Sequence, residues 1–457
     1  MFKSVRNVHF VGIGGIGMSG IAEILINQGF SVSGSDLARS ENTEYLENKG
    51  AKIYYGHSAE NIAEAEVVVY SSAVKVADNP ETQAARAAGI PLIRRAEMLA
   101  EVSRLNYCLA VSGTHGKTTT TSMVGLILIK AGIDPTVIVG GRLRDFGGTN
   151  ARMGGGEWTV VEADEFDRSF LQLLPTIAIL NNIEPEHLDI YKDFDDLKRT
   201  FAEFANKVPF YGFVAVGLDD AGVRAVLSEI NKSVVTYGLS RHADIRAENI
   251  TYEENLTRYT VVERATGERA EVAIGIPGLH NVKNSLGAIT VARHLGVAWD
   301  VIVEALGDFT GVLRRFDIKG ERDGVLIVDD YAHHPSEVKS TLSAARNGWP
   351  DRRIVCLFQP HTFSRTAHLY EEFGQCFDEA DLLIITDVYA AREAPIEGVT
   401  GKLISDAATK FGHTNVVYLP DFATLGEEVR KLLQPGDMLL TLGAGNVYQI
   451  ANQLSGK

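Results

Sequence analysis

The chain contains little cysteine and proline, no long apolar run and no internal repeat. Three cysteines in 457 residues, none of them in a C-x-x-C pair, predict neither a disulfide framework nor a zinc site. No apolar run reaches the ~18 residues that a membrane span needs, and the first residues show no signal-peptide pattern. These absences predict a soluble, cytoplasmic protein that does not bind membranes.

Basic residues are scarce relative to acidic ones, with 44 lysines and arginines against 59 aspartates and glutamates and a net charge of −15. Such an excess of negative charge repels the phosphates of nucleic acids and of anionic lipids over distance. We therefore expect no nucleic-acid partner. An anionic small molecule can still bind through backbone amides and a few local cations.

Glycine, by contrast, is abundant: the chain has 44, where about 7% of residues is typical. The length predicts roughly three domains. Apolar runs of strand length alternate with amphipathic stretches, the pattern of α/β domains with mostly parallel sheets. We place a Rossmann-like domain at residues 1–105, a central domain with a P-loop ATPase-type α/β sheet at 106–313, and a second Rossmann-like domain at 314–457.

The first glycine cluster, Gly12–Gly17, follows a predicted strand and opens a predicted helix. Glycines there allow a tight turn and let a diphosphate approach the backbone N–H groups of the helix start. Asp36 ends the next strand, where an acid can bind a ribose hydroxyl. By itself this motif is compatible with a nucleotide diphosphate, with NAD and with a purely structural turn.

The second cluster, Gly113–Thr119, lies between the predicted strand Tyr107–Ser112 and a predicted helix. Backbone amides of such a loop cradle triphosphate oxygens, Lys117 can reach the β and γ phosphates, and the Thr118 hydroxyl can bind Mg²⁺. The loop is shorter than the usual G-x-x-x-x-G-K-[ST], because Val111 stands five residues before Gly116. The context still predicts a nucleotide triphosphate site.

Acidic and histidine side chains follow two further predicted strands. Glu162, Asp164 and Glu165 come after Glu157–Glu162, and Glu162 is the best candidate for a Mg²⁺ ligand. His187, after the next strand, can bind a second cation or orient an acyl phosphate. The alternatives are a solvated acidic turn and a structural histidine. A stretch with seven glycines, Gly140–Gly156, lies between and has no assigned role.

Three more motifs carry polar side chains at the ends of predicted elements. In His280-Asn281-x-x-Asn284 the two asparagines share a helix face and can read adenine or ribose edges, although Asn281 could simply cap the helix. Residues 329–335 and 359–365 follow strands of the third segment, where an arginine can clamp a carboxylate and a histidine can deprotonate an amine. The adjacent histidines 333 and 334 diverge in direction, which disfavours zinc.

Eight motifs in one order, spanning nearly the whole chain, resemble those of the Mur ligase family. They are Gly12–Ser19, Gly113–Thr119, Glu162–Glu165, Asn182–Asp189, His280–Asn284, Asp329–Pro335, Phe358–Thr366 and Val388–Pro395. The resemblance assigns the first glycine loop to UDP rather than to NAD.

The resemblance also implies site residues. The UDP-sugar site would contain Gly14, Gly15, Gly17, Asp36, Ser71 and Ser72. The ATP site would contain Gly113, Thr114, His115, Gly116, Lys117, Thr118, Thr119, His280, Asn281, Asn284 and Arg315. Tyr331, His333, His361 and Arg365 would bind the amino acid, and Thr118, Glu162 and His187 would bind metal. The catalytic set would be Lys117, Glu162, His187, His333 and Arg365.

The activity so implied is ATP-dependent ligation of L-alanine to the lactyl carboxylate of UDP-N-acetylmuramic acid, through an acyl phosphate, in peptidoglycan precursor synthesis. The resemblance implies Mg²⁺ as cofactor, with two ions expected. The alternative within the family is a recycling ligase that attaches a murein tripeptide instead. An NAD-dependent oxidoreductase would leave the second loop and the third segment unexplained, and a nucleotide sensor would leave the acids and histidines unexplained. We expect a monomer or a weak homodimer.

Overall fold

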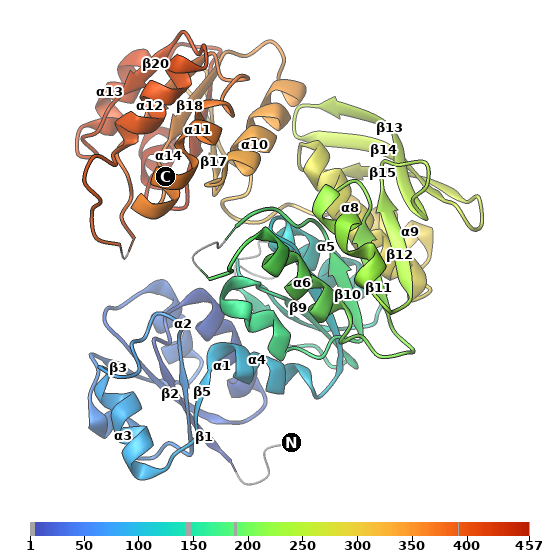
Figure 1. Cartoon of the computed structure of the whole chain (residues 1–457), viewed down its shortest axis with the longest axis vertical. Helices are drawn as coiled ribbons and strands as arrows, with labels where there is room; N and C mark the ends of the chain where they lie inside the picture. The colour runs from blue at the N-terminus through green and yellow to red at the C-terminus, as the bar shows by residue number, and fades with distance from the viewer. Residues whose placement is uncertain (1–4, 142–148, 187–189, 392, 457) are drawn as a thin grey trace. The chain divides into compact units, whose positions relative to one another are not determined.

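The computed structural model describes residues 5–141, 149–186, 190–391 and 393–456. By its internal contacts the chain divides into two compact units. The first comprises Met1–Glu248, Thr260–Val272 and Lys283–Phe309, and the second comprises Asn249–Tyr259, Ala273–Val282 and Thr310–Lys457. Three β-sheets, surrounded by helices, form the framework of these units (Figure 1).

The N-terminal sheet has five parallel strands in the order β3-β2-β1-β4-β5. Its strands are β1 (Asn7–Val11), β2 (Ser31–Asp36), β3 (Lys52–Tyr55), β4 (Val67–Tyr70) and β5 (Leu92–Arg94). The helices of this region are α1 (Ile16–Asn27), α2 (Glu41–Asn48), η1 (Ala59–Ile62), α3 (Pro80–Ala88) and α4 (Arg95–Ser103). This order, which reverses direction at β1, confirms the predicted Rossmann-like sheet.

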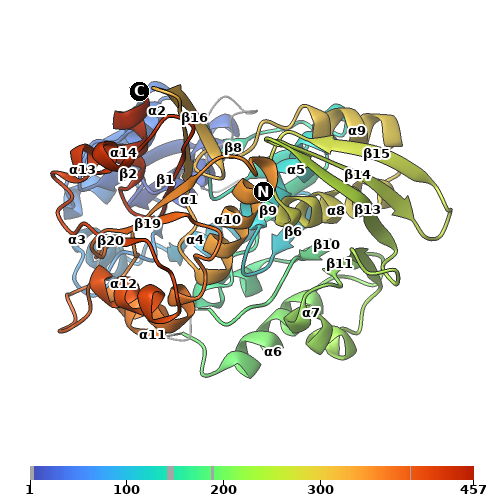
Figure 2. The ribbon, with the colours of Figure 1, turned by 90° about the horizontal axis from the view of Figure 1, so that it is seen from above.

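The second sheet has ten strands in the order β15-β14-β13-β12-β11-β10-β6-β9-β7-β8. The strands are β6 (Tyr107–Ser112), β7 (Thr136–Ile138), β8 (Ala151–Arg152), β9 (Trp158–Glu162), β10 (Ile177–Leu180), β11 (Phe213–Gly217), β12 (Val234–Gly238), β13 (Ile245–Glu253), β14 (Leu256–Glu263) and β15 (Arg269–Ile274). The last three lie side by side as a ribbon in both views (Figure 2). The helices are α5 (Lys117–Lys130), η3 (Phe166–Gln172), α6 (Phe194–Ala205), α7 (Ala221–Val226), η4 (Leu227–Glu229), α8 (Leu279–His294) and α9 (Trp299–Gly307).

The centre of this sheet positions the second glycine loop. Strand β6 pairs in parallel with β10 on one side and with β9 on the other. All three are apolar runs that are almost wholly buried, as expected for parallel strands covered on both faces. The carboxyl ends of β9 and β10 therefore flank the loop that follows β6.

The third sheet has six strands in the order β16-β17-β21-β18-β19-β20, of which only β16 is antiparallel to its neighbour. They are β16 (Asp317–Arg322), β17 (Val325–Asp330), β18 (Ile354–Phe358), β19 (Leu382–Ile385), β20 (Val416–Tyr418) and β21 (Met438–Leu442). The helices are α10 (Pro335–Gly348), α11 (Phe363–Gly374), α12 (Gly401–Lys410), α13 (Leu425–Leu432) and α14 (Tyr448–Ser455). One apolar cluster packs α10, α11 and α12 on one face, and another packs α13 and α14 on the other, which confirms a doubly wound sheet.

The structure bears on the expectations for the cysteines and for membrane-spanning helices. All three cysteines are buried and unpaired as thiols, in agreement with the absence of a disulfide framework. Over the described ranges, no helix has both the length and the apolar character that crossing a bilayer requires.

Candidate active site

The second glycine loop requires glycine at two positions. Gly113 has φ +140° and Gly116, the N-cap of α5, has φ +79°, a region that side chains rarely adopt. A Cβ at Gly116 would lie 2.3 Å from Oδ1 of Asn284, and one at Gly113 would lie 3.0 Å from Cβ of Asn181. The loop is thus tightly enclosed by Asn181, which follows β10, and by Asn284 of α8. Its N–H groups lie at the start of α5, a position that favours anion binding.

Two amide side chains just after β10 hold this loop in shape. The His115 N–H donates to Oδ1 of Asn182 over 2.7 Å, and the Thr114 N–H donates to the Asn182 carbonyl over 3.1 Å. Asn181 is oriented in turn by the hydroxyl of Tyr237, which donates to its Oδ1 over 2.7 Å. These hydrogen bonds reduce the ordering that the loop itself undergoes when a phosphate chain binds.

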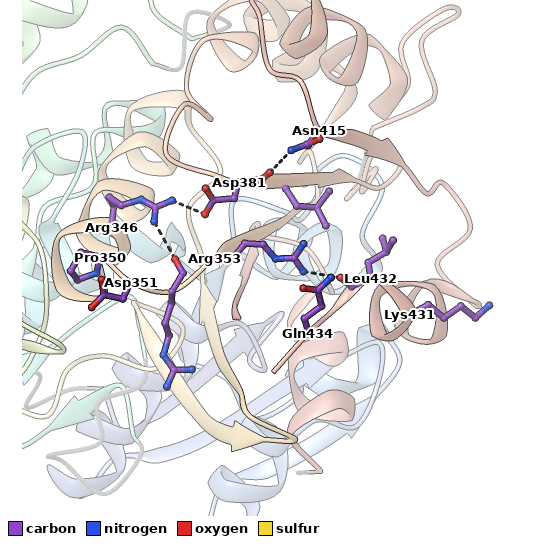
Figure 3. A pocket seen from close by; sticks show the side chains of 11 residues that line it. Arg346, Pro350, Asp351, Arg353, Asp381, Asn415, Lys431, Leu432 and Gln434 are labelled. Atoms are coloured by element: carbon purple, nitrogen blue, oxygen red, sulfur yellow. Dashed lines mark hydrogen bonds and ion pairs between the residues drawn. The ribbon is translucent and has the colours of Figure 1, made fainter. Parts of the chain in front are cut away.

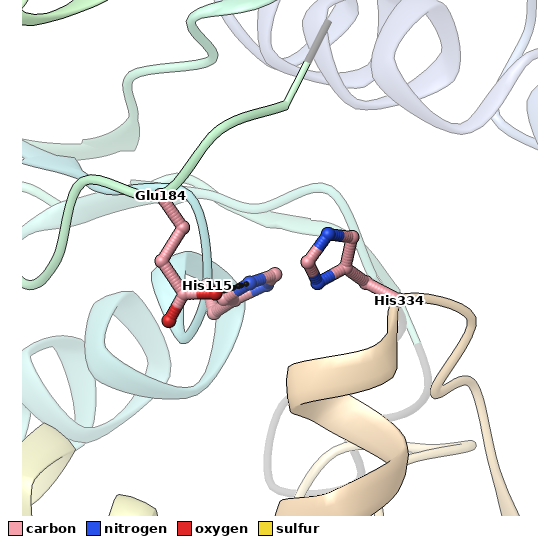
Figure 4. A group of neighbouring side chains, drawn as sticks. All are labelled: His115, Glu184 and His334. Carbon is pink, nitrogen blue, oxygen red and sulfur yellow. Dashed lines mark hydrogen bonds and ion pairs between the residues drawn. The ribbon is translucent and has the colours of Figure 1, made fainter. Parts of the chain in front are cut away.

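The side chains of His115 and Glu184 point toward one another (Figure 4), with 3.3 Å between Nε2 and Oε2. The Glu184 N–H also donates to the Thr114 hydroxyl over 2.9 Å. These contacts tie the loop to the segment that follows β10. The predicted role of His115 at the nucleotide remains a prediction.

Lys117 is bound to its own loop and to one carboxylate. Its Nζ donates to the carbonyls of Gly113 and Thr114, over 2.7 and 3.2 Å, and to Oε2 of Glu165 over 2.7 Å. Burial alone would lower the pKa of Lys117, but the charges of Glu165 and Asp164 raise it above its ordinary value. The lysine therefore carries a positive charge at the mouth of the loop, where the terminal phosphates of a nucleotide would lie.

Glu162, the last residue of β9, fits a hard cation. Its Oε1 is buried and has no hydrogen-bond partner among the described residues. Burial raises the pKa of Glu162, whereas the Gly140 N–H and the Thr118 hydroxyl beside it lower that pKa. A carboxylate oxygen without a donor, next to a hydroxyl, is the oxygen donor set that Mg²⁺ prefers. The third predicted metal ligand, His187, lies outside the described residues.

Asp36 accepts a hydrogen bond from the first glycine loop. Its Oδ2 accepts from the Gly14 N–H over 2.8 Å, and its Oδ1 accepts from the Leu37 N–H over 2.7 Å. Asn42 donates to the Gly14 carbonyl over 2.8 Å. A Cβ at Gly14 would stand 2.8 Å from Oδ2 of Asp36, so this contact needs glycine. Gly15 is exposed at the start of α1, as a residue that faces a diphosphate would be.

The remaining residues predicted for the UDP-sugar lie around the same loop. A Cβ at Gly17 would be 2.8 Å from Nη1 of Arg95, so glycine admits this arginine close to the helix start. Ser71 and Ser72 follow β4, and Cβ of Ser71 is 3.3 Å from the position of a Cβ on Gly12. The fold thus brings the whole predicted set to the carboxyl ends of β1, β2 and β4.

In the third segment, Tyr331, His333 and His361 gather at the carboxyl ends of β17 and β18. The ring of His333 lies 5.3 Å from that of Tyr331 and 5.9 Å from that of His361. Arg365 donates from Nη1 to Nδ1 of His361 over 3.4 Å. The four residues predicted to bind the amino acid therefore form one cluster in the second unit.

The ring nitrogens of the two histidines of this cluster face different kinds of partner. Nδ1 of His333 lies 3.0 Å from the Tyr331 carbonyl and 3.2 Å from Oε2 of Glu337, and both of these atoms can only accept, so Nδ1 carries the proton. Nδ1 of His361 faces the Arg365 guanidinium, which can only donate. Burial, together with the charges of His333 and Arg365, lowers the pKa of His361 to about 4.

Arginines 314 and 315 both reach this cluster. The Arg315 guanidinium lies 5.3 Å from the Tyr331 ring and 3.4 Å from Glu337. Arg314, which the sequence did not single out, stands 4.9 Å from the same ring and binds Oδ2 of Asp329 over 3.2 Å. Within the second unit, Arg315 thus lies beside the predicted amino-acid residues, and its contact with the nucleotide stays a prediction.

Helix α8 carries both asparagines of the His280–Asn284 motif. It begins two residues before Asn281, so Asn281 is not its N-cap; together with His280 it lies in the first turn, and its Nδ2 donates to the Pro277 carbonyl over 2.7 Å. Asn284, one turn later, lies against Gly116. Asn284 therefore lies at the second glycine loop.

A hollow of about 720 Å³ lies at the opposite edge of the third sheet (Figure 3). Its cations are engaged by carboxylates: Arg346 binds Asp381 over 2.7 Å and Arg353 binds Asp437 over 2.6 Å. Arg353 directly precedes β18, whereas His361 follows it. The hollow is therefore remote from the cluster of Tyr331, and its arginines stabilise the sheet edge.

Sequence reasoning missed the partners of the key residues. The acidic run after β9 and the motif after β10 did not reveal which of their members act on the loop. The structure makes Glu165 the partner of Lys117 and Asn182 a support of the loop. Their position directly after strands that flank β6 was the available signal.

Comparison with known families accounts for nearly the whole chain. The model described as "Mur ligase family, catalytic domain" matches residues 7–107, "Mur ligase middle domain" matches 111–292, and "Mur ligase, glutamate ligase domain" matches 314–445. Each match covers one of the three sheets and its motifs.

Individual proteins agree with these matches. The chain is 52% identical over 456 residues to a UDP-N-acetylmuramate–L-alanine ligase of Syntrophotalea carbinolica, covering 100% of this chain and 98% of that protein. It is 50% identical over 446 residues to the ligase of the same name from Salinibacter ruber, covering 97% and 93%.

Two solved structures share the complete architecture. A UDP-N-acetylmuramate–alanine ligase of Thermotoga maritima superposes with a TM-score of 0.83 at 29% identity, covering 98% of both chains. A murein peptide ligase of Psychrobacter arcticus has a TM-score of 0.73 at 25% identity, again over 98% of both chains. With three family models in the predicted order and relatives at half identity over the full length, this chain belongs to the Mur ligase family.

Proposed function

We propose that this protein joins L-alanine to the lactyl carboxylate of UDP-N-acetylmuramic acid, with hydrolysis of ATP to ADP and phosphate, in the synthesis of peptidoglycan precursors. The main support is the sequence identity of 50–52%, over nearly the full length, with UDP-N-acetylmuramate–L-alanine ligases. The P-loop with Lys117 and the cluster around His333 supply the two kinds of chemistry that such a reaction needs. We propose that the reaction takes place in the cytoplasm, where nucleotide substrates are available.

We assign one substrate to each predicted domain: the UDP-sugar to residues 1–105, ATP to 106–313 and alanine to 314–457. Support comes from the glycine loop braced by Asp36, the loop that holds Lys117, and the cluster of Tyr331, His333, His361 and Arg365. The oligomeric state, a monomer or a weak homodimer, stays a prediction.

For magnesium, the residues fit. Glu162, whose buried Oε1 has no hydrogen-bond partner in the described part of the chain, would hold one ion together with Thr118, and His187 would contribute to a second. When bound, Mg²⁺ supplies neutralisation of the phosphate oxygens and so makes the terminal phosphorus more reactive. This assignment is a proposal about donor chemistry.

The first step would be attack of the lactyl carboxylate on the γ-phosphorus of ATP. A new O–P bond forms, the bond to the β-phosphate oxygen breaks, and ADP leaves with that electron pair. The charge of Lys117 and the N–H groups at the start of α5 stabilise the negative charge of the transferred group. The product is an acyl phosphate, which reacts with an amine where the carboxylate did not.

In the second step the alanine nitrogen attacks the acyl carbon and phosphate leaves, and the nitrogen must lose a proton as the C–N bond forms. His333 suits this role better than His361, a choice that the sequence left open. With its proton on Nδ1, held by Glu337, His333 has its basic lone pair on Nε2. In His361 the basic atom Nδ1 is occupied by Arg365.

The variant His333→Gln tests this assignment. We expect alanine ligation to fall by about 10²–10⁴-fold, the range for loss of a general base. Hydroxylamine is neutral at pH 7, unlike the ammonium group of alanine, so hydroxamate formation from the acyl phosphate depends less on a base and should persist. The control is His361→Gln, which should lose less ligation activity. Equal loss of hydroxamate and of ligation in His333→Gln would contradict a role confined to the amine step.

The substrate assignment is tested by ADP release with purified protein, ATP, Mg²⁺ and UDP-N-acetylmuramic acid. We expect release to require L-alanine and the product to have the mass of UDP-N-acetylmuramoyl-L-alanine. A murein tripeptide in place of alanine should give no more than the background rate. Stimulation by the tripeptide alone would reject the alanine reaction in favour of the recycling ligase, and ADP release with neither amine nor sugar would reject both.

A further inference from the structure

The glycine-rich stretch between β7 and β9 contains a short strand that links two regions of the first unit. Strand β8 pairs antiparallel with β7, with Val137 opposite Arg152 and Ile138 opposite Ala151. The pairing continues one step further, because the Val139 N–H donates to the Asn150 carbonyl over 2.9 Å. Strand β8 also contacts α1, the helix that begins in the first glycine loop. This strand pair therefore spans from the central sheet to α1.

Asn150 makes the contact with α1. Its side chain is buried, with 7% exposed, and its Nδ2 donates to the carbonyl of Ile16, the first residue of that helix. A Cβ on Gly20 would lie 2.9 Å from the same Nδ2. Helix α1 thus carries a glycine where Asn150 approaches it, although a mid-helix glycine is ordinarily unfavourable.

The other end of the strand pair reaches Glu162. Gly140 comes directly after Val139, and its N–H hydrogen-bonds to the Glu162 carboxylate. A Cβ on Gly140 would lie 2.7 Å from Oε2 of Glu162, so this approach also depends on glycine. One backbone ladder therefore joins the start of α1 to the carboxylate beside Thr118.

We propose that Asn150 is a positioning residue that couples occupation of the UDP-sugar loop to the arrangement of Glu162 at the ATP site. The inference rests on the proposed function, which assigns the two nucleotides to these two loops. A diphosphate at Gly14–Gly17 orders the first turn of α1 and with it the Ile16 carbonyl. Asn150, held by that carbonyl, fixes β8 against β7, and Gly140 then holds the Glu162 carboxylate.

We expect the coupling to be positive, because binding of either nucleotide orders the β7–β8 strand pair. The first ligand to bind bears the entropy loss of fixing the strand pair, and the second ligand then binds to a site that is already ordered. Each nucleotide should therefore bind more tightly when the other is present, and by the same factor in both directions. Coupling factors between sites are typically about 5–150-fold.

The experiment measures the Kd of the non-hydrolysable analogue AMP-PNP with Mg²⁺, by titration calorimetry, with and without saturating UDP-N-acetylmuramic acid. We expect the wild-type ratio of the two Kd values to be at least about 5, and Asn150→Ala to reduce it to within about twofold of 1. Each nucleotide alone should keep its affinity for the variant within about threefold. A merely structural contact would change stability and leave the ratio unchanged.

Two further variants guard against misfolding. Gly20→Ala displaces the Asn150 side chain without removing it and should also abolish the ratio. The double variant Gly20→Ala with Asn150→Ala has room for the new methyl group, so its melting temperature should recover while the ratio stays near 1. Thr149→Ala is the matched control, because its hydroxyl donates to the Ala151 carbonyl of β8; it should keep the wild-type ratio.

The outcomes separate the two proposals. A wild-type ratio of 1 with both nucleotides bound, or a wild-type ratio in folded Asn150→Ala, would overturn the coupling role of Asn150 and leave the ligase assignment intact. Failure of the wild-type protein to bind UDP-N-acetylmuramic acid at all would instead overturn the proposed function, and the inference with it.

Discussion

Replacing Lys117 by alanine is expected to abolish formation of ADP. The ammonium group is held at the mouth of the loop by two carbonyls and by Glu165, so it is already positioned for the terminal phosphates. A cation that stabilises phosphoryl transfer contributes about 10³–10⁵-fold to the rate. We expect a loss of that size in kcat, measured as ADP release with all three substrates at saturation.

The variant must be designed so that loss of activity is not loss of the fold. Without Lys117, the Glu165 carboxylate, whose pKa burial raises to about 7, would be left buried and uncompensated. Lys117→Ala is therefore best combined with Glu165→Gln. Lys130→Ala, at the other end of the same helix, removes a lysine that pairs with Glu304 and Asp308, and should retain full activity. ADP release surviving in the double variant would refute the assignment of the loop.

The second large effect is expected for Glu162→Gln, which should lower activity without lowering the free energy of unfolding. The amide keeps the shape of the side chain but removes the anionic oxygen that we propose binds Mg²⁺. Loss of several kcal/mol of charge stabilisation corresponds to a decrease of about 10²–10³-fold in kcat. The Mg²⁺ concentration needed for half-maximal activity should rise as well.

Stability should not fall with activity in this variant. Burial raises the pKa of Glu162, which means that ionising it within the folded protein is unfavourable. A neutral amide avoids that penalty, so the free energy of unfolding in urea at pH 7 without Mg²⁺ should be unchanged or higher. Such a trade of stability for function is common at active sites.

The control for this variant is Glu157→Gln, an exposed glutamate immediately before the same strand. It should alter neither activity nor Mg²⁺ dependence. Wild-type Mg²⁺ dependence in Glu162→Gln would remove Glu162 from the metal site. A large loss of unfolding free energy would show that its contact with Gly140 outweighs the penalty of burying charge.

The motifs of the active site were predictable because each is local. A glycine loop, the strand before it and the helix after it are fixed by a dozen neighbouring residues, and strand ends in a parallel sheet meet at one edge. The loops at Gly12 and Gly113 and the cluster after β17 and β18 follow from this rule alone. The three-part α/β architecture follows equally from the alternation of buried strands and amphipathic helices.

The pairings within the site were not predictable, because they depend on contacts between residues distant in the sequence. Three acids lie within four residues of the chain at Glu162–Glu165, and only the packing of β9 beside β6 directs Glu165 to Lys117 and Glu162 to Thr118. The spacing of Asn281 and Asn284 did not reveal their partners, which in the structure are the Pro277 carbonyl for Asn281 and Gly116 for Asn284.

The same division holds for the chemistry of the third segment and for the glycine-rich stretch. Residue types alone identified two histidines but could not assign their protons, which the Tyr331 carbonyl and the Arg365 guanidinium determine in space. Glycine content marked residues 140–156 without explaining them; the structure shows that Gly140 admits the Glu162 carboxylate, whereas residues 142–148 lie outside the described residues. The sequence by itself determined which groups are present and at which strand ends, since these are properties of short segments. The tertiary structure alone decided which group acts on which, because proton positions, charges and coupling depend on distances across strands.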